Sequence, residues 1–317
     1  MDQATPTKSS GVQTVSWLLL AAALGLAVFL VGRARHAAPA ASERVDPLLL
    51  VPAGPRLLIS ADVSSLSKVA AKDLARLGGE KLLGLRDTCG FEPLLALEHA
   101  VFAMPFVDAT SAGTGSDFAF VAATSIDAQR GLKCAEQVIQ KRGGSTGRTQ
   151  LGKFTSVRDL SKPVGEVAFR PDGMFVLSGG QYFRDVMDAA AGAVQVNDAA
   201  RLRTQLHRSL RDKLGPAQLK LTLLPEASSV LRGVLALGLG VEVGADVGVR
   251  GVVVCGSVEA CSKAHDVIVG ASRQMAKEPG LSGLRTLKVL EQQDRLELSA
   301  RLPREQLGPL LSQLLSN

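Results

Sequence analysis

Hydrophobic and polar positions follow three different patterns along this chain. From Trp17 to Val31 the sequence WLLLAAALGLAVFLV has no polar position, and it lies inside a 24-residue run without charge between Lys8 and Arg33. A helix rises ~1.5 Å per residue, so ~20 residues cross a ~30 Å hydrocarbon core. Trp17 also stands where an interfacial aromatic side chain belongs. We therefore predict one transmembrane helix over residues 16–32 that contacts the lipid bilayer from Trp17 to Val31.

Two other interpretations of this apolar stretch remain open, a cleaved signal peptide and a buried core helix. The small residues at 38–41 resemble a cleavage site. Arg33 and Arg35, however, lie between the apolar run and that site, where signal peptides usually lack positive charge. An uncleaved anchor is the interpretation that the flanking residues favour.

The sequence around the anchor predicts the domain organisation. Residues 1–15 are polar and lack an apolar period, which is typical of a disordered tail. Residues 33–50 are rich in Ala and contain Pro, as in a short linker. Two units follow, at 51–195 and 196–317.

Residues 51–195 alternate between the two-residue period of strands and the longer period of helices. We expect strands at 56–63, 100–107, 117–123, 153–158, 166–169 and 174–178, and helices at 64–79, 81–88, 127–142 and 182–191. Pro171-Asp172-Gly173 predicts a hairpin turn between the last two strands.

Two stretches, one beginning at Asp117 and one at Asp246, run in the same order of strand, helix, strands and helix, with slight sequence identity. A basic amphipathic helix is expected at 198–213, strands at 219–224, 233–243, 246–255, 284–291 and 295–300, and a helix at 257–277. A closing helix is expected from Pro303 to about residue 315, since Pro suits the first helical position. The predicted fold class is α+β, with antiparallel-rich sheets, helices on one face, and possibly two similar halves after one transmembrane helix.

Composition narrows the function classes. Hydrophobic residues make up 46% of the chain and charged residues 21%, which indicates a folded protein. Aromatic residues are only 4%, which is poor material for stacking on sugars or bases. The net charge of +6 is mild and its basic residues are scattered. We therefore expect no nucleic-acid partner.

The four cysteines are the candidate site residues. Cys255 ends a predicted strand and Cys261 lies one turn into the next helix, so a reversal at Gly256 would bring them within bridging distance. Cys89 lies in the first helical layer and Cys134 on the helix expected at 127–142, and these can pack side by side. We predict disulfides Cys89–Cys134 and Cys255–Cys261. Free buried thiols remain an alternative.

A metal site is a further alternative, because Cys255, Cys261 and His265 could supply three soft ligands. The spacing CGSVEAC is not that of a CxxC metal or redox motif, and nothing points to a fourth ligand. No catalytic residue, cofactor-binding residue or metal ligand is assigned.

Other motifs for chemistry are weak. Gly238, Gly240 and Gly244 do not have the spacing of a dinucleotide- or phosphate-binding loop, and glycines within strands more often mark close packing. The four histidines, His36, His99, His207 and His265, stand in no recognised catalytic pattern. Asp62, Asp117 and Asp246 suit turns and strand edges as well as catalysis. We expect no cofactor.

The segment VPAGPRLLISADVSSLSKV, followed by the turn Cys89-Gly90-Phe91, resembles uncharacterised single-pass membrane-anchored bacterial proteins. The resemblance covers most of residues 51–310, and its motifs are structural. It implies an extracytoplasmic α+β domain and carries no activity onto particular residues.

These observations favour a membrane-anchored envelope protein, a non-enzymatic binding or structural module with a possible envelope protein partner. The alternative is an envelope enzyme whose site is assembled from distant loops. Arg33 and Arg35 oppose an outward C-terminal domain, because the cytoplasmic flank is usually the more basic one. The linker, the cysteines and the resemblance favour the outward orientation.

Overall fold

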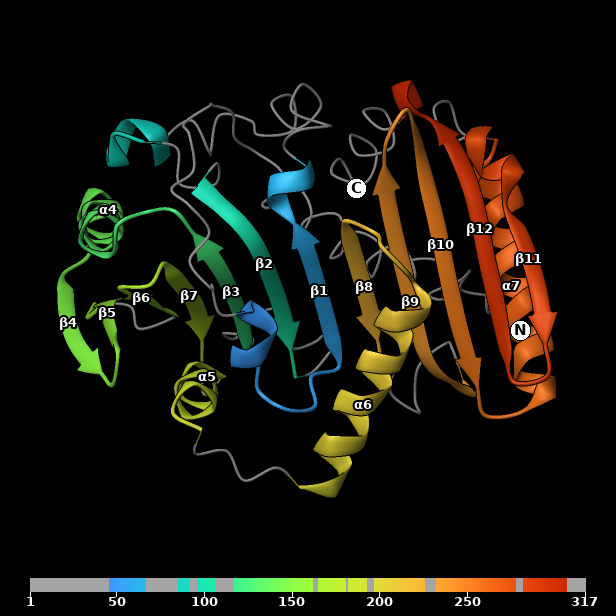
Figure 1. The fold of residues 1–317 in the computed structure, drawn as a ribbon, viewed down its shortest axis with the longest axis horizontal. Helices are drawn as coiled ribbons and strands as arrows, with labels where there is room; N and C mark the ends of the chain where they lie inside the picture. Colours follow the sequence, from blue (N-terminus) through green and yellow to red (C-terminus); the bar gives the residue numbers. More distant parts are fainter. Residues whose placement is uncertain are drawn as a thin grey trace, which may run out of the picture.

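The computed structural model describes residues 46–66, 85–91, 96–105, 117–161, 165–180, 182–192, 197–225, 232–277 and 282–306. Its centre is a 12-stranded antiparallel sheet in the order β11-β12-β10-β9-β8-β1-β2-β3-β7-β6-β5-β4 (Figure 1). The α+β class and the large antiparallel sheet agree with the prediction.

In chain order the elements are η1 (Pro47–Leu50), β1 (Leu57–Asp62), β2 (Leu97–Met104), β3 (Phe118–Thr124), α4 (Ala128–Lys141), β4 (Thr146–Leu151), β5 (Phe154–Asp159), β6 (Gly165–Arg170), β7 (Met174–Gly179), α5 (Tyr182–Ala190), α6 (Asp198–Lys213), β8 (Leu219–Leu223), β9 (Val234–Val243), β10 (Asp246–Cys255), α7 (Val258–Met275), η4 (Ser282–Thr286), β11 (Lys288–Gln292), β12 (Arg295–Pro303) and η5 (Arg304–Gln306).

The two ends of the sheet are built in the same order. Each begins with three consecutive antiparallel strands, β1-β2-β3 and β8-β9-β10, and continues into a helix, α4 or α7. The chain then returns through hairpins until its last strand pairs with the third one, β7 with β3 and β12 with β10. The two sets meet where β1 pairs with β8, with Leu58 opposite Thr222. One continuous sheet therefore joins them.

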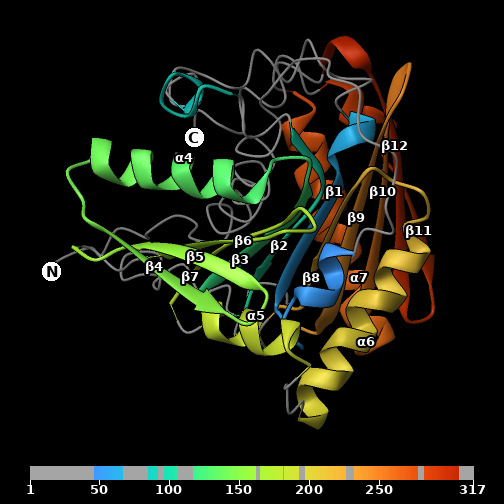
Figure 2. The ribbon, with the colours of Figure 1, turned by 60° about the vertical axis from the view of Figure 1, so that its left-hand side comes forward.

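Helices cover both faces of this sheet, so the prediction of helices on one face is wrong. Neighbouring strand residues point to opposite faces. In β10, Val252 packs in a cluster with α6, whereas Val253 packs in a cluster with α7. In β3, Val121 packs with α5, and Phe120 belongs to a different cluster. Figure 2 shows α4 and α5 on opposite sides of the same strands.

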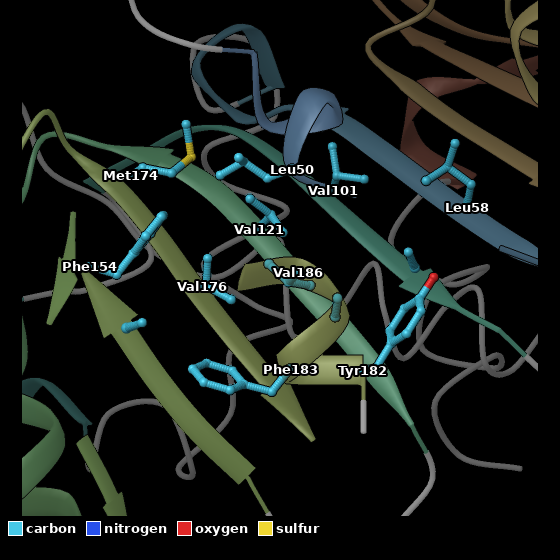
Figure 3. Packing of buried hydrophobic residues seen from close by; sticks show 13 residues of the cluster. Leu50, Leu58, Val101, Val121, Phe154, Met174, Val176, Tyr182, Phe183 and Val186 are labelled. Carbon is cyan, nitrogen blue, oxygen red and sulfur yellow. The ribbon is translucent and has the colours of Figure 1, made fainter. Parts of the chain in front are cut away.

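The face covered by η1, α5 and α6 is called the entry face, because the described chain enters the fold there. Its main cluster joins Val101, Val121 and Val176 of the sheet to Tyr182 and Val186 of α5 (Figure 3). Leu50 of η1 belongs to the same cluster and is almost fully buried. The last four residues of the predicted linker at 33–50 are therefore part of the fold, a correction caused by the burial of Leu50.

Local capping explains where the helices begin. The side chains of Asp127, Asn197 and Ser257 each accept a hydrogen bond from the backbone N–H three residues later. A side-chain oxygen at this position satisfies a donor that the first helical turn leaves free. The beginnings of α4, α6 and α7 thus follow from the sequence.

Two sequence predictions need correction, and one strand was missed. Pro303 ends β12 instead of starting a helix, and only the three-residue η5 follows among the described residues. The first three residues of the strand expected at 284–291 belong to η4 (Ser282–Thr286), and β11 starts at Lys288. β4 was not predicted, since its residues TGRTQL are half-buried or exposed along their whole length.

Several predictions fall on residues outside the described part of the chain. These are the tail at 1–15, the transmembrane helix at 16–32, the helix expected at 64–79 beyond residue 66, and the closing helix beyond residue 306. No described helix is both long enough and apolar enough to cross a membrane.

Candidate functional site

The four candidate cysteines form two disulfides, Cys89–Cys134 and Cys255–Cys261. Their Cα atoms are 4.7 Å and 5.4 Å apart, respectively. The pairing is the one expected from the sequence. Each bridge involves the helix that follows a three-strand set, with Cys134 in α4 and Cys261 in α7.

The Cys89–Cys134 bridge holds residues 85–91 against α4. The guanidinium of Arg130 lies 4.5 Å from the ring centroid of Phe91 and donates a hydrogen bond of 3.3 Å to the carbonyl of Gly90. Lys141 Nζ donates to Thr88 Oγ1 at 3.1 Å. This segment is therefore fixed to α4 by a covalent bond and by polar contacts on both sides of it.

The metal site considered from Cys255, Cys261 and His265 does not form, because both thiols are used in a disulfide. His265 Nδ1 lies 3.3 Å from a carboxylate oxygen of its neighbour Asp266. The residues that the structure describes contain no group of three His, Cys, Asp or Glu side chains placed to hold a metal ion.

Asp62 and His99 are the second described His–acid pair, with 3.9 Å between His99 Nδ1 and Asp62 Oδ1. Ser64 and Ser65 donate their hydroxyl hydrogen bonds to Asp62. Burial opposes ionisation of Asp62, but these bonds and one from the backbone of Ser65 hold the pKa of its carboxyl below the usual value. Asp62 thus caps the helical turn at 63–66, which is a structural role.

The glycines of β9 and its turn also have structural roles. A Cβ on Gly240 would lie 3.1 Å from Ala217 Cβ and 3.3 Å from Leu214 Cβ, and one on Gly238 would touch Leu214 and Leu210. These strand glycines let α6 approach the sheet closely. Gly244 donates its N–H to the carbonyl of Asp246 in the β9–β10 turn. No phosphate loop is present at these positions.

A buried polar junction joins α6 to the start of the fold, and the sequence analysis missed it. His207 Nε2 lies 2.8 Å from the carbonyl oxygen of Pro55, and Nδ1 lies 2.6 Å from Thr222 Oγ1. A carbonyl only accepts hydrogen bonds, so Nε2 carries the proton. Burial lowers the pKa of His207, and the nearby Arg211 and Arg203 lower it further. The neutral ring therefore accepts a hydrogen bond from the Thr222 hydroxyl at Nδ1.

Two side chains of α6 also form hydrogen bonds with Gly54, the residue before Pro55. The Gly54 N–H donates to Thr204 Oγ1 at 3.0 Å, and Arg203 Nε donates to the Gly54 carbonyl at 2.9 Å. Arg211 donates to the hydroxyl of Ser60 in β1. Three turns of α6 are thus hydrogen-bonded to residues 54–60.

The periodicity of α6 held a signal for this junction. Ala200, His207, Leu210 and Leu214 recur at helical spacing, so they share one face, and all four are buried. A histidine among apolar residues on one helix face needs polar partners inside the fold. Those partners, Pro55 and Thr222, come from distant parts of the chain and give no local signal.

Searches of protein-family models and of curated proteins found no match. Among solved structures, crystal form III of TP0453 is similar, with a TM-score of 0.53 and 12% identity over 86% of this chain and 100% of that one. Crystal form I of TP0453 gives a TM-score of 0.51 and 11% identity over the same shares. At these identities the similarity concerns the fold alone.

Proposed function

We propose that this chain is a membrane-anchored envelope protein whose α+β domain lies outside the cytoplasm and works as a non-enzymatic binding or structural module. The observation that supports the location is the pair of disulfides, Cys89–Cys134 and Cys255–Cys261. Disulfides persist in oxidising compartments and are rare in the cytosol. The apolar stretch from Trp17 to Val31 is the proposed anchor.

The side chains of the domain support a binding role over catalysis. In the two His–acid pairs that the structure describes, His99 lies beside Asp62 and His265 beside Asp266. The serines near His99, Ser64 and Ser65, donate their hydroxyl hydrogen bonds to Asp62. A hydrolase of the Ser-His type needs its nucleophile hydrogen-bonded to the histidine. His207, the buried histidine, is occupied by Pro55 and Thr222. A rigid sheet with firmly attached helices suits a module that presents a surface to an envelope partner.

Reporter fusions after Asn317 test the location. A phosphatase that works only outside the cytoplasm should be active, and a fluorescent protein that folds only inside should be dark. Deleting residues 17–31 is the matched control and should reverse both signals, because the domain then loses its route across the membrane. A fusion active only in the cytoplasm contradicts the proposal.

A further inference from the structure

The domain enters its fold close to the proposed anchor. Fourteen residues separate Val31 from Asp46, the first described residue. A chain of this length reaches at most about 50 Å when fully extended. Such a tether keeps the domain beside the bilayer at a high effective concentration. A weak contact with lipid is therefore enough to hold it there.

The entry face is the part of the domain nearest to this tether. Asp46 caps η1, which packs on β2, β3 and α5, and the chain then passes to Gly54 and Pro55 under α6. Figure 1 shows η1, α5 and α6 on the same side of the sheet, with α7 on the other. The tether thus leaves the domain within the layer formed by these three elements.

Exposed leucines mark this layer. Leu49 of η1 is 69% exposed, and Leu202 and Leu206 of α6 are 60% and 37% exposed. Leu202 and Leu206 are four residues apart and lie one turn above the other on the helix surface. Leu202 lies on the side of α6 opposite His207, which is buried, and Leu206 lies at the edge between the exposed and buried faces. Leu49 and Leu202 therefore leave most of their apolar surface uncovered by the described fold.

The charges around these leucines suit anionic lipid headgroups. α6 contains five basic and two acidic residues. Arg201 and Arg208 are exposed on it, and Arg184 is exposed on α5. Long basic side chains can lie along an apolar surface while their charged ends reach the headgroups. Such a combination of exposed leucine and arginine is typical of a helix that lies in the plane of a membrane surface.

We propose that the entry face lies on the bilayer in which the chain is anchored, with Leu49, Leu202 and Leu206 in contact with lipid. This inference rests on the proposed anchor. It deepens the proposed function by fixing which side of the domain faces the membrane. The opposite side, which carries α4 and α7, then faces the envelope and its partners.

The test uses the full chain in phosphatidylcholine vesicles that contain phosphatidylglycerol, with a site for a specific protease introduced in the linker at 37–42. Hydroxyl-radical labelling and mass spectrometry compare the anchored domain with the domain released by the protease and separated from the vesicles. Labelling of Leu49, Leu202 and Leu206 should rise severalfold on release. Leu160 and Val267, each 53% exposed on other parts of the domain, are internal controls and should not change.

A variant pair adds a second measurement. In Leu202→Asp the fraction of cut domain that stays on the vesicles should fall about tenfold, since burying the exposed 60% of Leu202 in lipid contributes roughly 1.4 kcal/mol. Val267→Asp, a matched change on the outer surface of α7, should leave this fraction unchanged. Equal losses in both variants contradict the docking.

The outcomes separate the two proposals. If alkaline carbonate leaves the chain in the vesicles but the three leucines are labelled equally before and after release, the docking is overturned and the anchor stands. If carbonate extracts the chain, the anchor is overturned and the docking loses its basis. If protection persists after release and grows with protein concentration, a second copy covers this face and the lipid contact is overturned.

Discussion

His207 and Pro55 are 152 residues apart in the chain, and a hydrogen bond of 2.8 Å from the imidazole Nε2 to the Pro55 carbonyl joins them. The bond connects α6 to the residues that lead into β1. Because β1 pairs with β8 at the centre of the sheet, the junction lies where the two similarly ordered parts of the fold meet. Its protonation state should therefore influence the stability of the whole domain.

The stability of the full chain should fall when the pH falls through the range in which free histidine titrates. The pKa of His207 lies below its usual 6.5 in the fold because of burial. Below pH 6.5 the histidine binds a proton more readily in the unfolded chain than in the folded chain. Stability is thus complete above about pH 6.5 and declines below it, by at most ~1.4 kcal/mol per pH unit for one group.

His207→Gln isolates this contribution. The variant cannot titrate at position 207, so its free energy of unfolding should be lower at neutral pH but should depend less on pH between about 8 and 5. Chemical denaturation at several pH values measures both. Parallel curves for wild type and variant would show that His207 is not responsible for the pH dependence.

Gly54 should not tolerate a side chain. Its φ angle is +76°, and a Cβ would lie 2.7 Å from Ala200 Cα in α6. Gly54→Ala should destabilise the fold by roughly 2 kcal/mol or more through backbone strain and the forced shift of α6. Gly270→Ala is the control: nothing lies within 4 Å of a Cβ there, so this exposed helix position should gain about 1 kcal/mol. A thermal melt of each variant shows whether the two changes have opposite signs.

Removing the hydroxyl of Tyr182 should stabilise the fold. This hydroxyl is buried without a hydrogen-bond partner in the described part of the structure, and burial raises the pKa of Tyr182 far above its usual value. An unpaired buried polar group costs roughly 1–3 kcal/mol, so Tyr182→Phe should gain about 1 kcal/mol. Tyr182→Ala instead leaves a cavity in the cluster of Val121 and Val176 and should lose about 3–5 kcal/mol. A loss of stability in Tyr182→Phe would show that the hydroxyl has a partner.

The two bridges should differ in their contribution to stability. Cys89 and Cys134 are separated by 45 residues, and Cys255 and Cys261 by 6. On the chain-entropy model the long loop contributes roughly 4 kcal/mol and the short loop about 2. Replacing each pair by serine and measuring unfolding by denaturant should show this order. The reverse order would mean that loop length does not dominate.

Much of the fold could be predicted from local patterns. The helix at 198–213 and the strand at 246–255 have the predicted bounds, because a capping residue or a turn stands at their ends. Both disulfide pairs were also predicted, since Cys255 and Cys261 are close in sequence and Cys89 and Cys134 lie on adjacent layers. Caps, turns and the Cys255–Cys261 pair are short-range constraints that neighbouring residues determine, whereas the Cys89–Cys134 pair was predicted from the order of the helices.

Long-range features could not be predicted in the same way. An amphipathic helix such as α5 or α6 shows that it has a buried face, but its sequence does not tell which side of the sheet that face covers. Edge strand β4 lacks an apolar alternation, because neither of its faces is fully buried. The partners of His207 come from residues 55 and 222, so the junction depends on the tertiary fold.

Mass spectrometry of non-reduced peptides from the native host tests the central claim most directly, because it detects the bridges as they exist in the cell. Free thiols are alkylated before lysis, so that no bridge can form afterwards. We expect two linked peptide pairs, one joining Cys89 to Cys134 and one joining Cys255 to Cys261, in protein recovered from the membrane fraction. Four alkylated thiols would contradict both the disulfides and the oxidising compartment on which the proposed location depends.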